Sequence, residues 1–280
     1  MEDKTIQRFD SRILKHIVFD VDGTLYTKDF EYSPGNGSIQ TAHDFFRFLA
    51  FQRLKNGNKS PFEISQSLIK EYQLNTKNNN LKEIVKSIPQ DLKNDYESLV
   101  KKYGSNGKVF VGELRVDSGY LHQMLSFIDF GAILAPDTKL KQLIKKLDKN
   151  GYDLGILTTE VYSTIEKVFN SLGINLNDFV MPTGDKYKIL CSENVKQKKP
   201  SPEGFERLKE IYGADNPREI VYVGDVLEKD IEPSLKSGLQ AVHVSSSEPR
   251  VTFQVADIDT CKKEYAKVNS IYDLEELLCL

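Results

Sequence analysis

Two aspartates separated by one residue follow a mostly apolar run near the start of the sequence. The run is Ile13 to Phe19, and Asp20, Asp22, Gly23 and Thr24 come directly after it. Alternate side chains of a strand share one face, so the two carboxylates start on the same side as the chain leaves the strand. Neighbouring carboxylates repel each other unless a cation or a shared proton relieves them. The pattern predicts a Mg²⁺ site, a nucleophile with an acid/base partner, or both, although Asp-Gly is also a common turn pair.

Further polar side chains follow the later predicted strands or precede a predicted helix. Ligands of an open parallel sheet bind beyond the carboxyl ends of its strands, so these residues are expected to meet the two aspartates. Taken singly, each is also compatible with a turn, a helix cap or a solvated charge, and their ordered agreement is what favours a site. The residues are Thr158 and Thr159 after 153–157, Lys199 before the helix start at Ser201-Pro202, Gly224 and Asp225 after 219–223, and Asp230.

This set of residues is suited to phosphoryl transfer. The carboxylate of Asp20 could attack phosphorus and form an aspartyl-phosphate. Asp22 could protonate the leaving alcohol and then deprotonate the attacking water. The carboxylates of Asp20 and Asp225, with the backbone carbonyl of Asp22, offer the hard oxygen ligands that Mg²⁺ prefers. Lys199 and the hydroxyl of Thr158 could hold the remaining phosphoryl oxygens, so that the lysine and the cation together offset the charge. The predicted supporting residues are Gly23, Thr24, Thr159, Gly224 and Asp230.

The elements that must position these residues alternate between strands and helices from about residue 135 onward. This alternation predicts an α/β fold, a Rossmann-like, doubly wound parallel sheet with helices on both faces, which also includes the first strand. A final amphipathic helix is expected over 270–278, whereas most of 248–268 has no assigned element. The predicted strands are 153–157, 219–223 and 239–244, and the predicted helices begin after Asp137, at Val161, at Ser201-Pro202 and at Lys229.

The stretch between the first strand and residue 135 has a helical character and shows no clear strand alternation. It is too long for an ordinary loop and is predicted to be an inserted all-helical cap domain that opens to admit substrate. The expected domains are a core of 1–27 and 135–280 and a cap of 28–134. Most of the cap's aromatic side chains are assigned to its own core. Its predicted helices include Ile39 to Leu49, one beginning at Ser60-Pro61, Leu81 to Ile88, Leu92 to Tyr103 before Gly104, and 119–127.

Composition and charge exclude several classes of protein. The 280 residues include 38 basic and 41 acidic side chains, which gives no basic surface for a nucleic-acid polymer. No apolar stretch approaches the length of a membrane span, and the segment from Met1 to Ser11 lacks the apolar part of a signal peptide. Cys191, Cys261 and Cys279 are odd in number and far apart, which predicts neither a disulfide framework nor a zinc site and favours the reducing cytoplasm.

The four chemical segments resemble, in order, the motifs of the haloacid dehalogenase-like superfamily. Residues 20–24 resemble motif one, Thr158 motif two, Lys199 motif three and residues 224–230 motif four. The resemblance implies a Rossmann-like core with a helical cap of the first type inserted after motif one. It also implies that Asp20 is the nucleophile and Asp22 the acid/base, since dehalogenases need no acid there whereas phosphatases and phosphomutases use one.

Two further details refine this resemblance. Motif two is often followed by Asn, and Thr159 stands there instead. The continuation Leu25-Tyr26 and the cap's Tyr103-Gly104 are similar to fungal pyrimidine 5′-nucleotidase-type hydrolases, although those relatives often have Asn in place of Gly23. The closer similarity implies a nucleotide substrate, which the pattern of residues alone does not specify.

The expected function is Mg²⁺-dependent hydrolysis of a small phosphomonoester through an aspartyl-phosphate. The resemblance implies a nucleoside 5′-monophosphate or a similar small phosphorylated metabolite as substrate. A phosphomutase, acting for example on a phosphosugar, would use the same residues but return the phosphoryl group to its product. A catalytically silent regulatory protein with the same fold is the third reading, and the intact set of Asp20, Asp22, Lys199 and Asp225 argues against it.

Overall fold

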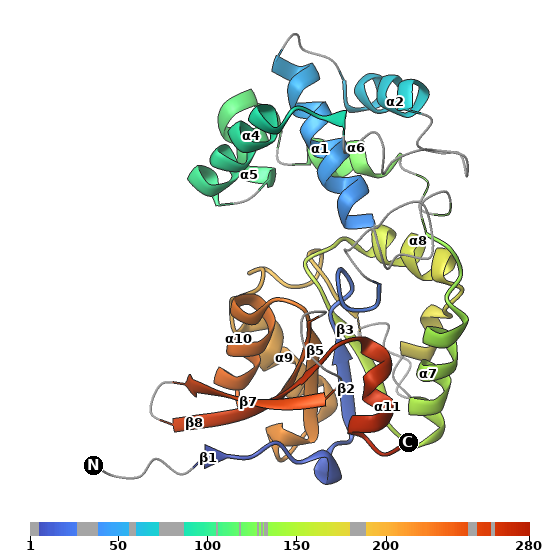
Figure 1. Ribbon diagram of the computed structural model, residues 1–280, viewed down its shortest axis with the longest axis vertical. Coiled ribbons are helices and arrows are strands. Elements are labelled where there is room, and N and C mark those ends of the chain that lie inside the picture. The colour runs from blue at the N-terminus through green and yellow to red at the C-terminus, as the bar shows by residue number, and fades with distance from the viewer. Residues whose placement is uncertain are drawn as a thin grey trace. The chain divides into compact units, whose positions relative to one another are not determined.

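The computed structural model divides the chain into two compact units (Figure 1). The first unit contains Met1–Tyr26 and Pro136–Leu280, and the second contains Thr27–Ala135. None of the helices in the described part of the chain is long and apolar enough to span a bilayer. Most of the helix predicted over Leu81 to Ile88 lies outside the described residues. The structure describes residues 6–26, 39–55, 60–72, 87–104, 106–117, 119–127, 129, 131, 134–179, 189–245, 251–258 and 261–280.

The first unit is built on an eight-stranded sheet with the order β1-β8-β6-β5-β2-β3-β4, and β7 pairs with β8. Among the described strands, every pairing is parallel except the antiparallel one between β7 and β8. The central strands are almost entirely apolar because helices cover both of their faces. The strands are β1 Ile6–Gln7, β2 His16–Phe19, β3 Asp153–Leu157, β4 Ile189–Leu190, β5 Ile220–Gly224, β6 Gln240–Val244, β7 Val251–Ile258 and β8 Cys261–Val268.

The helices of this unit lie on both faces of the sheet, so the predicted doubly wound α/β fold is confirmed. Helices α7 (Thr138–Lys149) and α8 (Tyr162–Leu172) lie on one side, with α9 (Glu203–Tyr212) and α10 (Glu232–Lys236) on the other (Figure 1). The chain passes from β2 outward to β3 and β4, then crosses back to β5 and β6. This reversal places β2 at the switch point, where ligands of such sheets bind beyond the carboxyl ends of the strands.

Local sequence signals explain where these helices begin and end. Asp137 is the N-cap of α7 and accepts a hydrogen bond from the backbone N–H of Leu140 at 2.9 Å. Helix α8 ends at Gly173, whose positive φ of 73° suits a residue without a side chain. Both boundaries agree with the predicted ones, and the buried apolar face of α7 follows the helical period.

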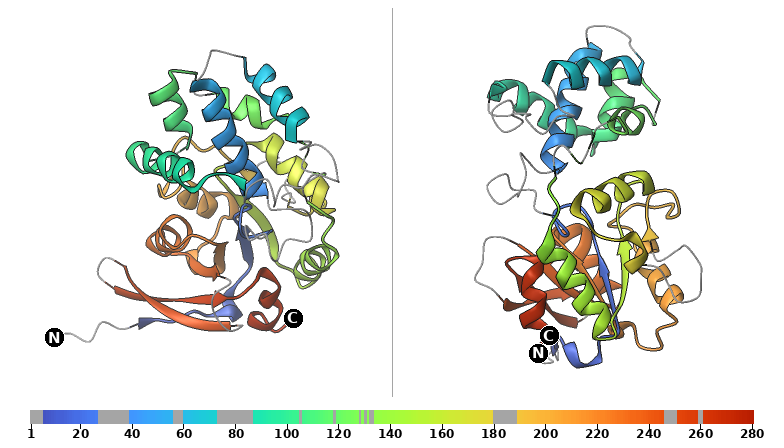
Figure 2. Two further views of the ribbon diagram at one scale, coloured as in Figure 1. Left: turned by 45° about the horizontal axis from the view of Figure 1, so that its top comes forward. Right: turned by 90° about the vertical axis from the view of Figure 1, so that its right-hand side faces the viewer.

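The C-terminal part of the chain forms a hairpin that the sequence did not reveal. Strands β7 and β8 pair antiparallel over their whole length, and β8 also pairs with β6 and β1 on its other side. The hairpin therefore forms one edge of the sheet (Figure 2). The final helix predicted over 270–278 is present as a 3₁₀ turn, Ile271–Asp273, followed by the short α11, Leu274–Leu277.

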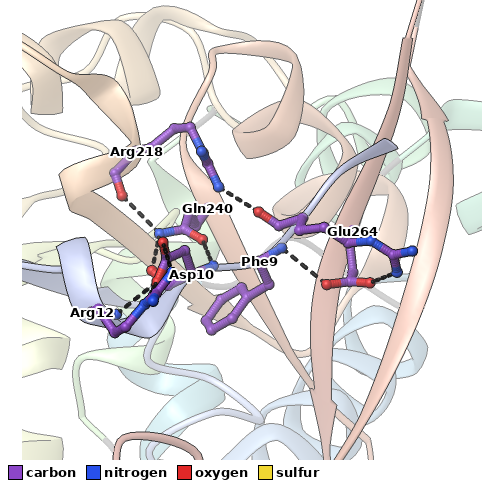
Figure 3. Close-up of polar contacts among 7 residues, drawn as sticks. Phe9, Asp10, Arg12, Arg218, Gln240 and Glu264 are labelled. Carbon is purple, nitrogen blue, oxygen red and sulfur yellow. Dashed lines mark hydrogen bonds and ion pairs between the residues drawn. The ribbon is translucent and has the colours of Figure 1, made fainter. Parts of the chain in front are cut away.

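Side chains from β6 and β8 hold the N-terminal segment against the sheet, an arrangement called here the N-terminal clasp (Figure 3). The amide oxygen of Gln240 accepts the backbone N–H of Asp10 at 2.6 Å, and its amide nitrogen donates to the Asp10 carbonyl at 2.8 Å. That nitrogen also donates to the Arg218 carbonyl at 2.8 Å. On β8, Glu264 accepts the backbone N–H of Phe9 at 3.0 Å and forms an ion pair with Arg8.

The described part of the second unit is helical, and its helix ends follow the predicted signals. Ser60 and Glu63 form a reciprocal capping box at the start of α2, with N–H to oxygen distances of 2.8 and 3.3 Å. Gly104 ends α4 with a φ of 82°. The helices are α1 Ile39–Lys55, α2 Pro61–Tyr72, α4 Gln90–Tyr103, α5 Asn106–Leu114 and α6 Tyr120–Leu125.

Aromatic side chains form much of the core within this second unit. The ring centroid of Phe51 lies 5.1 Å from that of Tyr96 and 6.3 Å from that of Phe110. Phe48 approaches Tyr96 edge-on at 6.0 Å, and all four side chains are buried. Such tilted and edge-on pairs stabilise aromatic clusters. These four aromatics therefore serve the interior of the unit, as the helical spacing predicts.

Candidate active site

Three adjacent parallel strands bring the predicted site residues to one edge of the sheet. Phe19 at the end of β2 lies between Ile156 of β3 and Val223 of β5. Asp20 is the next residue, and its backbone N–H donates to the Val223 carbonyl at 2.9 Å. Thr158 and Asp225 follow β3 and β5 at the same edge.

The carboxylate of Asp20 is buried in a surplus of negative charge. The residue is 8% exposed, and its Oδ1 lies 3.1 Å from the Nζ of Lys199. Burial raises the pKa of Asp20 to about 7, an effect that Lys199 opposes and that the carboxylates of Asp230, Asp22 and Asp225 increase. A cation bound nearby would therefore favour the ionised form that a nucleophile needs.

Lys199 uses its ammonium group to join three buried side chains. Its Nζ donates to Asp230 Oδ1 at 2.6 Å and to the Tyr222 hydroxyl at 2.6 Å, in addition to its contact with Asp20. Its side chain is only 5% exposed. Burial by itself would lower the pKa of Lys199, but the carboxylates of Asp20 and Asp230 outweigh it, so the pKa is raised and the side chain stays charged.

The loop after β5 returns Asp230 to the site, and this requires a glycine at position 224. Asp230 is 1% exposed, and its Oδ2 accepts the backbone N–H of Val226 at 2.9 Å. A Cβ atom on Gly224 would lie 2.7 Å from Asp230 Cγ and 2.8 Å from its Oδ2, closer than such atoms approach. The sequence assigned Asp230 a supporting role, whereas the structure places it in direct contact with Lys199.

Carboxylate oxygens of Asp20, Asp225 and Asp230 lie within 4.8 Å of one another, and these three residues are called here the acid cluster. Asp20 and Asp225 are two of the predicted metal ligands, and Asp230, which was predicted as a supporting residue, lies beside them. The donor atoms are hard carboxylate oxygens, and among the described residues Lys199 pairs with Asp20 and Asp230, so the negative charges outnumber the positive one. Both properties fit Mg²⁺.

Asp22 lies in a tight turn, and the chain leaving this turn brings Tyr26 beside Asp22. Gly23 has a φ of 80°, and the backbone N–H groups of Thr24 and Leu25 donate to the Val21 carbonyl at 3.3 and 3.0 Å. The hydroxyl of Tyr26 donates to Asp22 Oδ1. This contact was not predicted, although its sequence signal, a tyrosine four residues after an acid across a glycine, is present.

The two threonines after β3 occupy different environments. Thr158 is buried, and its backbone N–H donates to the Leu190 carbonyl of β4 at 2.9 Å. Its hydroxyl oxygen accepts the backbone N–H of Glu160 at 3.3 Å, and no acceptor for the hydroxyl proton is found in the described part of the chain. That proton can serve a ligand oxygen. Thr159 is partly exposed, and Thr24 is buried with a hydroxyl that lacks a partner among the described residues.

Tyr222 is a second residue of the site that sequence reasoning missed. It lies fully buried on β5, where it packs edge-on against Phe205 with ring centroids 5.0 Å apart. Its hydroxyl donates to the Leu157 carbonyl at 2.7 Å while it accepts from Lys199. Burial holds the pKa of Tyr222 well above its usual range, so the phenol stays neutral. The signal available was a single tyrosine within an otherwise aliphatic strand.

Comparisons with known proteins agree with this architecture. A glyceraldehyde 3-phosphate phosphatase of Methanopyrus kandleri is 22% identical over 252 residues, which cover 88% of this chain and 93% of that protein. A solved HAD phosphatase from Thermococcus onnurineus aligns with a TM-score of 0.54 at 19% identity, over 95% of this chain and 98% of the other. A 2-haloacid dehalogenase from Pseudomonas syringae aligns with a TM-score of 0.50 at 18% identity, over 95% and 98%.

At these identities, the similarity to the two solved structures shows the fold alone. The family model described as haloacid dehalogenase-like hydrolase matches residues 14–238 of this chain. That range includes β2 to β5 and every residue of the site described above. The chain therefore belongs to the haloacid dehalogenase-like hydrolases.

Proposed function

We propose that this protein is a Mg²⁺-dependent phosphomonoester hydrolase that acts through an aspartyl-phosphate. The observation that supports this best is the position of Asp20, a buried carboxylate within the acid cluster and 3.1 Å from Lys199. A second carboxylate, Asp22, stands two residues later and supplies the acid that an alcohol leaving group requires. Displacement of halide would need no such acid, which favours phosphoryl transfer.

In the first half-reaction, an oxygen of Asp20 attacks phosphorus as the bond between phosphorus and the ester oxygen breaks. The carboxyl proton of Asp22 passes to that ester oxygen, so that a neutral alcohol leaves. The products are the alcohol, an aspartyl-phosphate on Asp20 and an ionised Asp22. In the second half-reaction, Asp22 removes a proton from water while the water oxygen attacks phosphorus. Inorganic phosphate leaves, and both carboxyl groups return to their initial states.

The remaining residues of the site balance charge and hold the phosphoryl group. The acid cluster would hold Mg²⁺, which supplies positive charge beside the phosphoryl oxygens. Lys199, fixed by Asp230 and Tyr222, keeps its ammonium beside Asp20 and offsets charge on the transferring group. The Thr158 hydroxyl donates a hydrogen bond to a phosphoryl oxygen, as its location at the end of β3 allows.

For the substrate, we propose a small phosphomonoester, with a nucleoside 5′-monophosphate as the first choice. The nucleotide rests on the similarity of Leu25-Tyr26 and Tyr103-Gly104 to pyrimidine 5′-nucleotidase-type hydrolases. The M. kandleri relative, described as a glyceraldehyde 3-phosphate phosphatase, favours a phosphorylated triose as the second choice. The two choices differ in the presence of a base, so one substrate panel separates them.

The test is phosphate release from a panel of nucleoside monophosphates, sugar phosphates and triose phosphates, with and without Mg²⁺. We expect Mg²⁺-dependent turnover that falls at least about a thousandfold in Asp20→Asn. Asp215→Asn, the same change at an exposed position, is the matched control and should keep full activity. Turnover by folded Asp20→Asn within tenfold of the wild type would exclude Asp20 as the nucleophile. Isomerisation of a phosphosugar without phosphate release would instead identify a phosphomutase.

A further inference from the structure

Tyr26 lies at the end of the turn after β2, beside Asp22, the residue proposed as the acid/base. The two backbone bonds to the Val21 carbonyl close this turn, and Asp22 and Tyr26 form an isolated parallel bridge across it. The bridge places the Tyr26 ring beside the Asp22 side chain, and the phenol donates to Asp22 Oδ1. Backbone geometry therefore fixes this pair of side chains.

The Tyr26 phenol acts toward Asp22 as a hydrogen-bond donor. The residue is only 7% exposed, and an ordinary phenol keeps its proton at neutral pH. A neutral phenol has one proton, and here that proton is directed to one oxygen of Asp22.

We propose that Tyr26 is a positioning residue that holds the Asp22 carboxyl group in the rotamer from which it exchanges a proton with the leaving oxygen. The proposal rests on the proposed phosphomonoesterase activity. During the reaction, the Tyr26 proton stays on the phenol, and only the Asp22 carboxyl proton moves to the ester oxygen as the bond to phosphorus breaks. A carboxyl group that rotates freely spends less time in the productive geometry, so general acid catalysis weakens without it.

This role predicts an effect that depends on the leaving group. An alkoxide is a poor leaving group and must be protonated as it departs, whereas p-nitrophenolate leaves readily as an anion. Loss of positioning at Asp22 therefore slows the cleavage of alkyl phosphates and leaves the formation of the aspartyl-phosphate from p-nitrophenyl phosphate almost unchanged. A tyrosine that only supports the fold around Asp20 would affect both substrates alike.

The experiment compares Tyr26→Phe with the wild type on glycerol 2-phosphate and on p-nitrophenyl phosphate, both with Mg²⁺. We expect kcat/KM for the alkyl ester to fall about 10- to 100-fold, a part of the full effect of a general acid. For the aryl ester we expect a change of less than about threefold, and KM for both should stay near the wild-type value. Equal losses on the two esters, or no loss on either, would overturn the proposal.

Tyr212→Phe is the matched control. Tyr212 is a partly buried tyrosine of the same unit, at the end of α9, and its buried hydroxyl has no hydrogen-bond partner among the described residues. Its ring packs against His16 with centroids 4.4 Å apart, at the opposite end of β2 from Asp20. Removal of this hydroxyl should change neither rate.

A double variant separates this proposal from the proposed function. Once Asp22→Asn has removed the acid, adding Tyr26→Phe should cause no further loss on glycerol 2-phosphate, and an undiminished loss would count against the coupling. Absence of phosphatase activity in the wild type, or full activity in Asp20→Asn, would overturn both proposals. Normal Asp20 dependence with equal losses in Tyr26→Phe would overturn only this one.

A second variant keeps the proposal testable if Tyr26→Phe does not fold. Tyr26→His retains a ring N–H donor in place of the phenol. Its ratio of alkyl to aryl turnover should lie above that of a variant without a donor, such as Tyr26→Leu. The reverse order would overturn the proposal.

Discussion

Two polar networks at different places in the same sheet differ in how their charges are balanced. In the N-terminal clasp, the neutral amide of Gln240 meets three backbone groups, and each of its hydrogen-bonding atoms has a partner. In the candidate active site, Asp20 and Asp230 share the ammonium group of Lys199, Asp225 adds a third carboxylate beside them, and the pKa of Asp20 is raised to about 7. Hydrogen-bond partners balance the polar atoms of Gln240, whereas negative charges outnumber positive ones among the described side chains around Asp20.

This difference indicates what each network contributes. Buried polar groups with all partners in place stabilise a fold, whereas buried charges without full compensation cost stability and are retained where chemistry needs them. We therefore expect changes in the clasp to alter stability alone. Changes in the site should alter activity, with effects on stability that depend on which charge is removed.

The largest expected effect is that of Lys199→Met, which removes the only ammonium that the described residues place in contact with Asp20 and Asp230. The variant should lose activity and about 3–5 kcal/mol of unfolding free energy, because it leaves buried carboxylates without compensation. Urea unfolding at pH 8 without Mg²⁺ measures this, with exposed Lys229→Met as the control. Adding Asp230→Asn should restore part of the stability and none of the activity. A loss in unfolding free energy below about 1 kcal/mol would show that the buried carboxylates do not depend on Lys199 for charge compensation.

The next effect is that of Gln240→Leu in the clasp. The change keeps the size of the side chain but leaves the backbone groups of Asp10 and the Arg218 carbonyl without their partner, which should cost about 2–4 kcal/mol of unfolding free energy. Turnover per folded molecule should not change. Gln254→Leu, on the exposed face of β7, is the control and should have little effect. A fall in kcat in the folded variant would contradict the separation of the two networks.

A smaller effect concerns pH and Mg²⁺. Because the folded-state pKa of Asp20 is raised to about 7, the stabilising contribution of its protonated form is fully present below about pH 4 and is lost as the pH rises through 7. Protons therefore compete with a cation for this carboxylate. Mg²⁺ at a hundred times its Kd should stabilise the wild type by about 2–3 kcal/mol at pH 8 and by clearly less at pH 5.5. Thermal unfolding measures this, and an equal gain at both pH values would argue against binding at Asp20.

The smallest expected effect is that of Glu264→Gln in the clasp. The amide oxygen can still accept the backbone N–H of Phe9, so the change removes only the ion pair with the largely exposed Arg8. Exposed ion pairs contribute little, and the loss in unfolding free energy should be below about 1 kcal/mol. A loss in unfolding free energy as large as that of Gln240→Leu would show that the ion pair, and not the hydrogen bonds to backbone groups, stabilises the clasp.

The elements that the sequence predicted are those with strong local signals. The cap of α7 at Asp137, the stop of α8 at Gly173 and the apolar strands β2, β3 and β5 all follow from nearby residues. Strands β1 and β4 have two residues each, and β7 and β8 carry many polar side chains. Their existence depends on distant partners, such as the pairing of β1 with β8, which no local pattern encodes.

The same limit applies to the candidate site. Residues that directly follow a strand, such as Asp20 and Thr158, could be expected at one edge because parallel strands end together. The direct contact of Asp230 with Lys199 depends on the close approach to Gly224, which only the folded loop reveals. The hydroxyl contacts of Tyr26 and Tyr222 depend likewise on turn and strand geometry, so the sequence showed these residues without their roles.

The strand order has a consequence for the protein as it emerges from the ribosome. His16 of β2 pairs with Asp153 and with Ile220, and Ile6 pairs with Lys262. At typical rates of translation, roughly 10–40 s separate the synthesis of β2 from that of β5. The unit Thr27–Ala135 is completed within that interval. The segment that carries Asp20 is thus made early and receives its neighbours late, so a nascent chain remains inactive until β5 and the loop after it have emerged.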